Sequence, residues 1–65
     1  MSQREYMQML FKRHGDNEDI LVREYAEAEM NGIVRRKRNQ NDLDSIKYAR
    51  ALYKDGMKKG WIRNS

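Results

Sequence analysis

The sequence predicts an all-α fold: a small three-helix domain with a long basic loop between its second and third helices. Apolar residues recur at helical spacing in three segments, and residues that favour helix starts and stops flank each segment. Proline is absent and no linker divides the 65 residues, so we expect a single domain over residues 1–65. A domain of this size gathers only about 3–5 kcal/mol from one core, which makes self-association or a partner surface a reasonable expectation.

The first helix is expected from about residue 3 to residue 14. Ser2 and Glu5 have the spacing of a capping box, in which each side chain accepts a hydrogen bond from the other residue's backbone N–H. Gly15 stands where the helix would end, because glycine adopts the left-handed conformation at little cost. The apolar face of this helix is predicted to consist of Tyr6, Met7, Leu10, Phe11 and His14.

The second helix is expected to begin at Asp16-Asn17 and to stop at Asn31-Gly32. Glu18 and Asp19 fall in its first turn, where carboxylates interact favourably with the positive end of the helix dipole. Its apolar face is predicted to consist of Leu21, Val22, Tyr25, Ala26 and Ala28.

The third helix is expected from a cap region at Asp42 to Ser45 to about Lys59. Gly56 lies at the centre of its apolar face, where a glycine costs about 1 kcal/mol relative to alanine, so we expect another helix to approach closely there. Gly60 ends the helix, and Trp61 is predicted to pack back onto the last turn; this is favoured over a base-stacking role. The apolar side is predicted to consist of Ile46, Tyr48, Ala49, Leu52, Tyr53, Gly56 and Met57.

The core is expected where these apolar faces meet. Between the second and third helices, Ile33-Val34 either plugs the core or forms a short extended piece. The residues expected to form most of the core are Leu10, Phe11, Leu21, Tyr25, Leu52 and Tyr53.

The side-chain inventory argues against an enzyme. His14, the only histidine, has no nearby serine or cysteine to form a nucleophile pair, and we interpret it as a packed, hydrogen-bonded residue. Glu29 projects into an apolar helix face, where we interpret it as a structural carboxylate that reaches water or pairs with Arg35 or Arg36. No zinc-binding, P-loop or dinucleotide-binding motif is present, so neither a metal nor a cofactor is predicted.

The compartment is predicted from composition. The chain has no cysteine, so neither a disulfide nor a thiolate-metal site is available. No apolar run approaches the roughly 20 residues of a membrane span, and the N-terminal residues lack the apolar block of a signal peptide. A cytoplasmic protein without a membrane anchor is the default expectation.

Charge divides the chain into two unlike halves. Residues 1–34 hold four cations and seven anions, whereas residues 35–65 hold ten cations and three anions. Such a split suggests a polyanionic partner for the basic half, although two solvated halves that attract each other would give the same pattern.

A DNA or RNA backbone is the partner that we predict from this charge, bound with little base specificity. A helix-turn-helix is rejected, because the would-be recognition helix is acidic and the connection between the second and third helices is too long. A basic run in this connection and a basic row on the third helix would share one surface if the loop folds back. The predicted contact residues are Arg35, Arg36, Lys37, Arg38, Lys47, Arg50, Lys54 and Lys58.

A second hypothesis belongs to a different class: a protein–protein interaction module or small homodimeric adaptor that binds no nucleic acid. The small core, the five methionines, and edge residues such as Met9 and Met30 favour it, because methionine adapts to varied partner surfaces. The acidic second helix of one copy meeting the basic third helix of another would be one such dimer. Salt separates the two hypotheses, because phosphate contacts weaken steeply with salt and apolar contacts do not.

Overall fold

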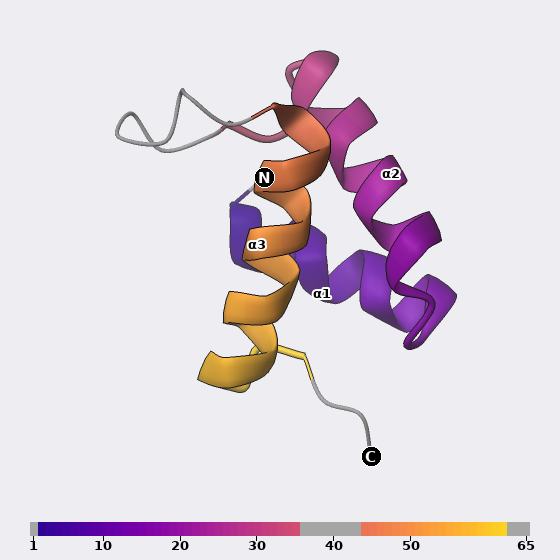
Figure 1. The fold of residues 1–65 in the computed structure, drawn as a ribbon, viewed down its shortest axis with the longest axis vertical. Coiled ribbons are helices and arrows are strands. Elements are labelled where there is room, and N and C mark those ends of the chain that lie inside the picture. The colour runs from indigo at the N-terminus through magenta and orange to yellow at the C-terminus, as the bar shows by residue number, and fades with distance from the viewer. Residues whose placement is uncertain (1, 36–43, 63–65) are drawn as a thin grey trace.

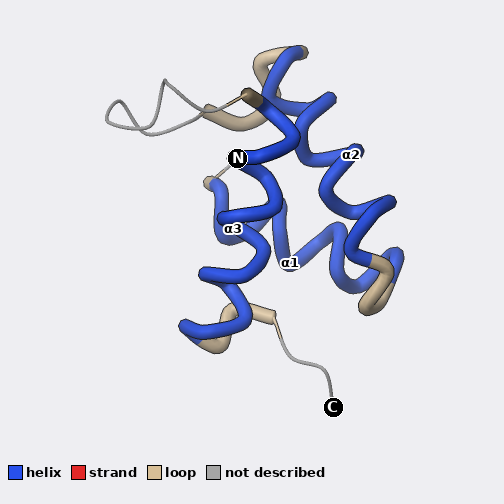
Figure 2. The backbone as a smooth tube through the Cα atoms, viewed as in Figure 1, coloured by secondary structure: helices blue, strands red, loops and turns tan. Residues whose placement is uncertain are grey.

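The computed structural model describes residues 2–35 and 44–62 and confirms the predicted all-α class. Within these ranges there are three helices and no strand: α1 (Gln3–His14), α2 (Glu18–Met30) and α3 (Ser45–Lys59) (Figures 1 and 2). The bounds agree with the predicted ones. Helix starts and stops were therefore correctly identified from local sequence signals.

The helices α2 and α3 form the main packed pair. They lie side by side and run in opposite directions, and α1 crosses behind them (Figure 1). At one end of the pair, Ser45 Oγ at the start of α3 donates a hydrogen bond of 3.2 Å to Glu29 Oε1 near the end of α2. Glu29 therefore has a structural role, as predicted, and Ser45 is a partner that the sequence did not predict.

Each helix begins with a side-chain cap. Ser2 Oγ accepts a hydrogen bond of 3.1 Å from the Glu5 N–H, and Asp44 Oδ1 accepts one of 2.8 Å from the Lys47 N–H. Asn17 caps α2 in the same way. Among the described residues, only this first half of the predicted capping box at Ser2 is present, and Glu5 is exposed.

Glycine ends both α2 and α3 with the same hydrogen-bond pattern. After α3, Gly60 adopts the left-handed conformation (φ 80°, ψ 15°), and the Trp61 N–H donates to the Gly56 carbonyl over 2.9 Å. After α2, Gly32 has φ 77°, and the Ile33 N–H donates to the Ala28 carbonyl over 2.9 Å. These are Schellman motifs, which satisfy carbonyls that the helix itself leaves free.

The core follows the prediction with one exception. Five of the six predicted residues are buried, but Phe11 is only partly buried and packs against the core's edge. Val34 is 2% exposed and plugs the core, whereas Ile33 is exposed. Ile46 is 42% exposed, so it lies at the margin of the apolar side to which it was assigned. The buried hydrophobic residues not among those six are Met7, Val22, Ala26, Ala28, Val34, Tyr48, Ala49 and Ile62.

The predicted reason for Gly56 is wrong. The space beside it is filled by Trp61 and Ile62, which return along α3 after its last turn, and not by another helix. A Cβ atom placed on Gly56 would lie 3.5 Å from the Trp61 ring and 3.7 Å from Ile62, which is ordinary van der Waals contact. The site therefore accommodates a methyl group.

Replacement of Leu52 by alanine is expected to lower the free energy of unfolding by about 2–5 kcal/mol, because it leaves a cavity between α3 and its neighbours. So small a domain would then be largely unfolded. Thermal unfolding followed by circular dichroism measures the change. Ile46→Ala removes an aliphatic side chain from the exposed margin of α3 and should cost much less; equal losses in the two variants would contradict the core assignment.

Gly56→Ala is expected to stabilise the protein by about 0.5–1 kcal/mol, because alanine loses less backbone entropy in a helix and fits without a clash. Gly60→Ala is the matched control. It places a Cβ at φ 80° and should destabilise by about 1 kcal/mol. A Gly56→Ala protein with a lower melting temperature than the wild type would show that the Trp61 contact does not tolerate the methyl group.

Candidate nucleic-acid interface

Three of the predicted phosphate contacts form a row along α3. Lys47, Lys54 and Lys58 are spaced by seven and four residues, which puts them on one helix face. All three are exposed, and none forms an ion pair with another described residue. At 1.5 Å of rise per residue, this lysine row spans about 16 Å.

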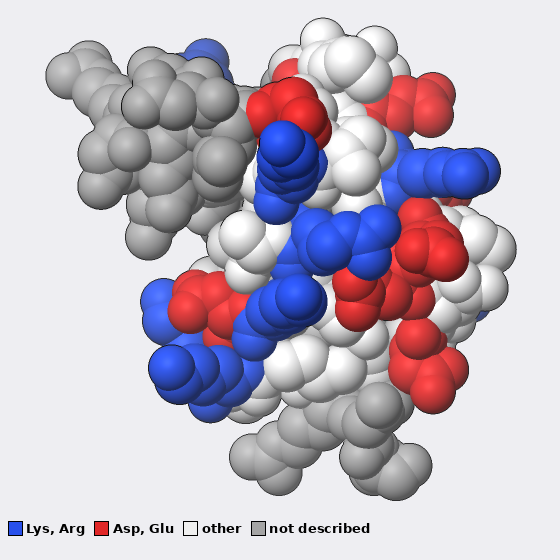
Figure 3. All heavy atoms as spheres, viewed as in Figure 1, with Lys and Arg blue, Asp and Glu red and all other residues white. Residues whose placement is uncertain are grey.

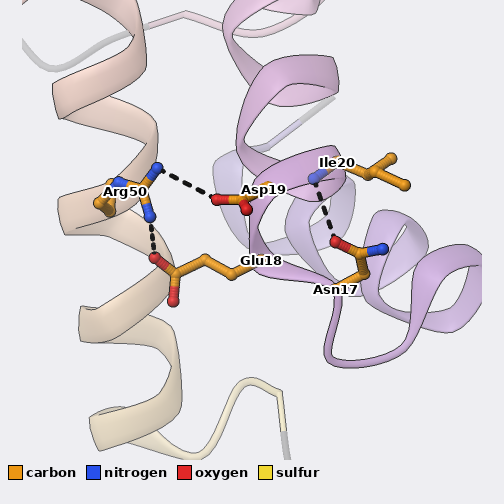
Figure 4. A network of polar contacts seen from close by, with 5 residues as sticks. All are labelled: Asn17, Glu18, Asp19, Ile20 and Arg50. Atoms are coloured by element: carbon orange, nitrogen blue, oxygen red, sulfur yellow. Dashed lines mark hydrogen bonds and ion pairs between the residues drawn. The ribbon is translucent and has the colours of Figure 1, made fainter.

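Arg50 lies on the same helix but is directed toward α2. Its Nη1 pairs with Glu18 Oε2, and its Nη2 lies 3.5 Å from Asp19 Oδ1 (Figure 4). Both carboxylates belong to the first turn of α2, which Asn17 caps. The Arg50 side chain is 41% exposed, so we expect this pair to stabilise the fold by only about 0.2–1 kcal/mol. Its main effect is to compensate the Arg50 charge, which distinguishes Arg50 from the lysine row.

The predicted basic loop is described only at its start. Arg35 is exposed, and its carbonyl accepts a hydrogen bond of 3.1 Å from Gln3 Nε2, which also contacts the Tyr48 hydroxyl. Gln3 therefore links the backbone at Arg35 to Tyr48 in the first turn of α3. The other three predicted contacts of this loop, Arg36, Lys37 and Arg38, lie outside the described residues.

The two packed helices carry opposite charge. Helix α2 contains five carboxylates and one arginine, whereas α3 contains five cations and one aspartate. On the face seen in Figure 3, most acidic side chains lie over α2 and most basic ones over α3. A polyanion that approaches this face is repelled by α2, so the outward side of α3 is the favoured approach.

The remaining cation of α3 is engaged locally. Lys59 Nζ lies 3.0 Å from Asp55 Oδ2, one helical turn back, and 5.3 Å from the centre of the Trp61 ring. Trp61 itself is partly buried and packs against the core, as predicted. Lys59 therefore interacts with Asp55 and Trp61 at the end of α3 and is not part of the lysine row.

Tyrosines line the buried contact between α2 and its neighbours. The Tyr25 ring meets the Tyr6 ring edge-on, with centroids 5.9 Å apart. Burial raises the pKa of the Tyr25 hydroxyl far above its ordinary value, and the nearby Tyr48 and Glu29 add to the shift. This hydroxyl has no hydrogen-bond partner in the described part of the chain. Burial, with a contribution from Glu18, also raises the pKa of Tyr53.

The described residues show no sign of a catalytic histidine, a metal site or a membrane span. His14 Nε2 contacts Glu24 Oε2 and so links α1 to α2, in agreement with its predicted structural role. No group of three or more potential metal ligands exists within residues 2–35 and 44–62. The helices of these ranges are also too short or too polar to cross a membrane.

Comparisons with protein-family models, with curated proteins and with solved structures found no match to the chain. Of the predicted contacts, Lys47, Lys54 and Lys58 share one exposed face of α3, whereas Arg50 pairs with Glu18 and Asp19 of α2. Arg35 is exposed, and its backbone is linked through Gln3 to Tyr48 of α3. Sequence analysis missed the role of Gln3, because a single glutamine in a first helical turn carries no signal of its tertiary partner.

Replacement of Tyr25 by phenylalanine tests the buried hydroxyl. At pH 7 the free energy of unfolding should stay within about 1 kcal/mol of the wild type or rise, because an unsatisfied hydroxyl gains nothing from burial. The raised pKa means that the folded protein holds this proton more tightly than the unfolded chain does. The resulting stability is complete below about pH 10, the unfolded value, and is lost as the pH rises further.

Denaturant unfolding at pH values between about 7 and 11 measures this effect, with the phenylalanine variant as the reference that lacks the titrating group. The wild type should lose more stability than the variant above about pH 10. Identical pH profiles would contradict the shifted pKa. A large loss in the variant at pH 7 would mean that the hydroxyl is satisfied.

Proposed function

We propose that this protein binds the phosphate backbone of DNA or RNA through the outward face of α3. The observation that carries the proposal is the lysine row: Lys47, Lys54 and Lys58 share one exposed face and none is compensated by a described carboxylate. Cations placed in this way release counterions when they meet phosphates, which is the main source of backbone affinity.

The chemistry of the row favours contact with phosphates over the reading of bases. Lysine presents a flexible point charge, whereas bidentate recognition of guanine depends mostly on arginine. The one arginine of α3, Arg50, is already engaged by Glu18 and Asp19. Affinity with little sequence preference is therefore expected.

The length of the row fits a double helix. Lys47 and Lys58 are about 16 Å apart along α3, which exceeds the roughly 12 Å width of a B-DNA major groove. Phosphates on both sides of such a groove are thus within reach of one helix face. Arg35, fixed beside the first turn of α3, extends the footprint at one end. Arg36, Lys37 and Arg38 remain predicted contacts on sequence grounds.

Fluorescence anisotropy titrations with duplex DNA, single-stranded DNA and RNA test the proposal at about 50 and 200 mM salt. Three phosphate contacts give a slope of about −2.7 in log affinity against log salt, a loss of about 40-fold over this range. The variant Lys47/Lys54/Lys58→Gln should lose most of the affinity and flatten the slope. A second variant, Arg36/Lys37/Arg38→Ala, measures the contribution of the predicted basic loop.

The matched control is Arg4/Arg13/Arg23→Gln, which removes the same charge from exposed positions of α1 and α2. If binding depends on the α3 face, this control retains most of the wild-type affinity. Equal losses in both triple variants would mean that net charge alone attracts nucleic acid. A folded wild type that binds none of the three ligands at 50 mM salt would refute the proposed function.

A further inference from the structure

An open groove separates α1 from the turn that follows α3. Its volume is about 730 Å³, and Met9, Phe11, Trp61 and Ile62 give it an apolar lining. Gln8 Nε2 donates a hydrogen bond of 3.0 Å to the Trp61 carbonyl, which links α1 on one side of the groove to the turn after α3 on the other. Met9, Phe11 and Trp61 are only partly buried, so they remain accessible from the groove.

The α1 wall of this groove has a self-complementary pattern. Glu5, Gln8, Met9 and Lys12 follow one another at spacings of three, one and three residues, which places them on a single helix face. An acidic residue stands at one end of this stripe and a basic residue at the other, with the neutral pair between them. Neither Glu5 nor Lys12 forms an ion pair with a described residue.

A two-fold axis between Gln8 and Met9 would match this pattern to itself. In an antiparallel pair of α1 helices, Glu5 of one copy then faces Lys12 of the other, twice by symmetry, and Met9 faces Gln8. The charged residues lie about 10 Å apart along each helix, so both pairs form in the same register. Self-complementarity of this kind identifies a second copy as the occupant, because an unrelated helix has no reason to carry the inverted pattern.

We propose that the α1 face, defined by Glu5, Gln8, Met9 and Lys12, is a homodimer interface in which α1 of each copy enters the groove beside Trp61 of the other. This inference goes beyond nucleic-acid binding and does not depend on it, because the lysine row belongs to α3. The size of the chain is compatible with it, since association is one of the ways in which domains below about 70–80 residues gain stability.

The chain's own charges allow a decisive test by analytical ultracentrifugation without nucleic acid. The wild type is expected to dimerise at micromolar to millimolar concentrations. Glu5→Lys and Lys12→Glu should each weaken the dimer about tenfold, because each change creates two like-charge contacts per dimer. The double variant Glu5→Lys/Lys12→Glu restores both pairs in the opposite sense and should dimerise nearly as well as the wild type.

Mixing the two single variants sharpens the test. In a mixed dimer both contacts become attractive, so the mixture should associate more tightly than either variant alone. Lys54→Glu and Glu27→Lys are the controls, because they reverse exposed charges on α3 and α2 and should leave the dimer unchanged. Circular dichroism checks the folding of every variant, because reversed charges near the ends of α1 oppose its helix dipole.

A measurement on the unaltered chain removes any dependence on variant folding. In a sample that mixes isotope-labelled and unlabelled wild type, intermolecular nuclear Overhauser effects are expected between the Met9 methyl group of one copy and the Trp61 ring of the other. A wild type that stays monomeric at about 1 mM, or a dimer that ignores the charge changes and lacks these effects, would overturn the proposal.

Discussion

The antiparallel packing of α2 against α3 is the contact on which the rest of the structure depends. Without a disulfide, the chain has to obtain its stability from apolar burial, and this pair supplies most of it. Tyr25 and Leu21 contribute from α2, and Leu52 and Tyr48 from α3. Because the packed faces are apolar, the charges of each helix are confined to the remaining faces. The sequence of α2 is mostly acidic and that of α3 mostly basic, so carboxylates gather over α2 and lysines over α3 (Figure 3).

The elements were predictable because their signals are local. A cap such as Ser2 and a stop such as Gly60 need only a few neighbouring residues, and the helical spacing of apolar residues identifies the buried faces. Which residues meet in the folded chain was harder to predict from the sequence. Phe11 lies on the predicted face but at its edge, and Gly56 is approached by Trp61, which belongs to the chain's own continuation.

The candidate site was also predictable only in part. Helical periodicity grouped Lys47, Lys54 and Lys58 correctly, because these positions share a face whatever α3 packs against. It also included Arg50, whose partners Glu18 and Asp19 lie more than thirty residues earlier in the chain. Distinguishing a free cation from a compensated one requires knowing which helix end comes alongside, and that is a property of the folded chain.

The hydrogen bonds of Gln3 and Glu29 have a consequence for how the sequence can change over time. Arg35 is held by Gln3, and Ser45 by Glu29, so the chain is fixed on both sides of residues 36–43 at one corner of the fold. The entropic contribution to the free energy of closing a loop between two fixed points grows slowly, by only about 0.6 kcal/mol for each doubling of the loop's length. Insertions between these two anchors are therefore expected to cost the three helices little stability. This is the part of the chain in which relatives would be free to differ most in length and in number of basic residues.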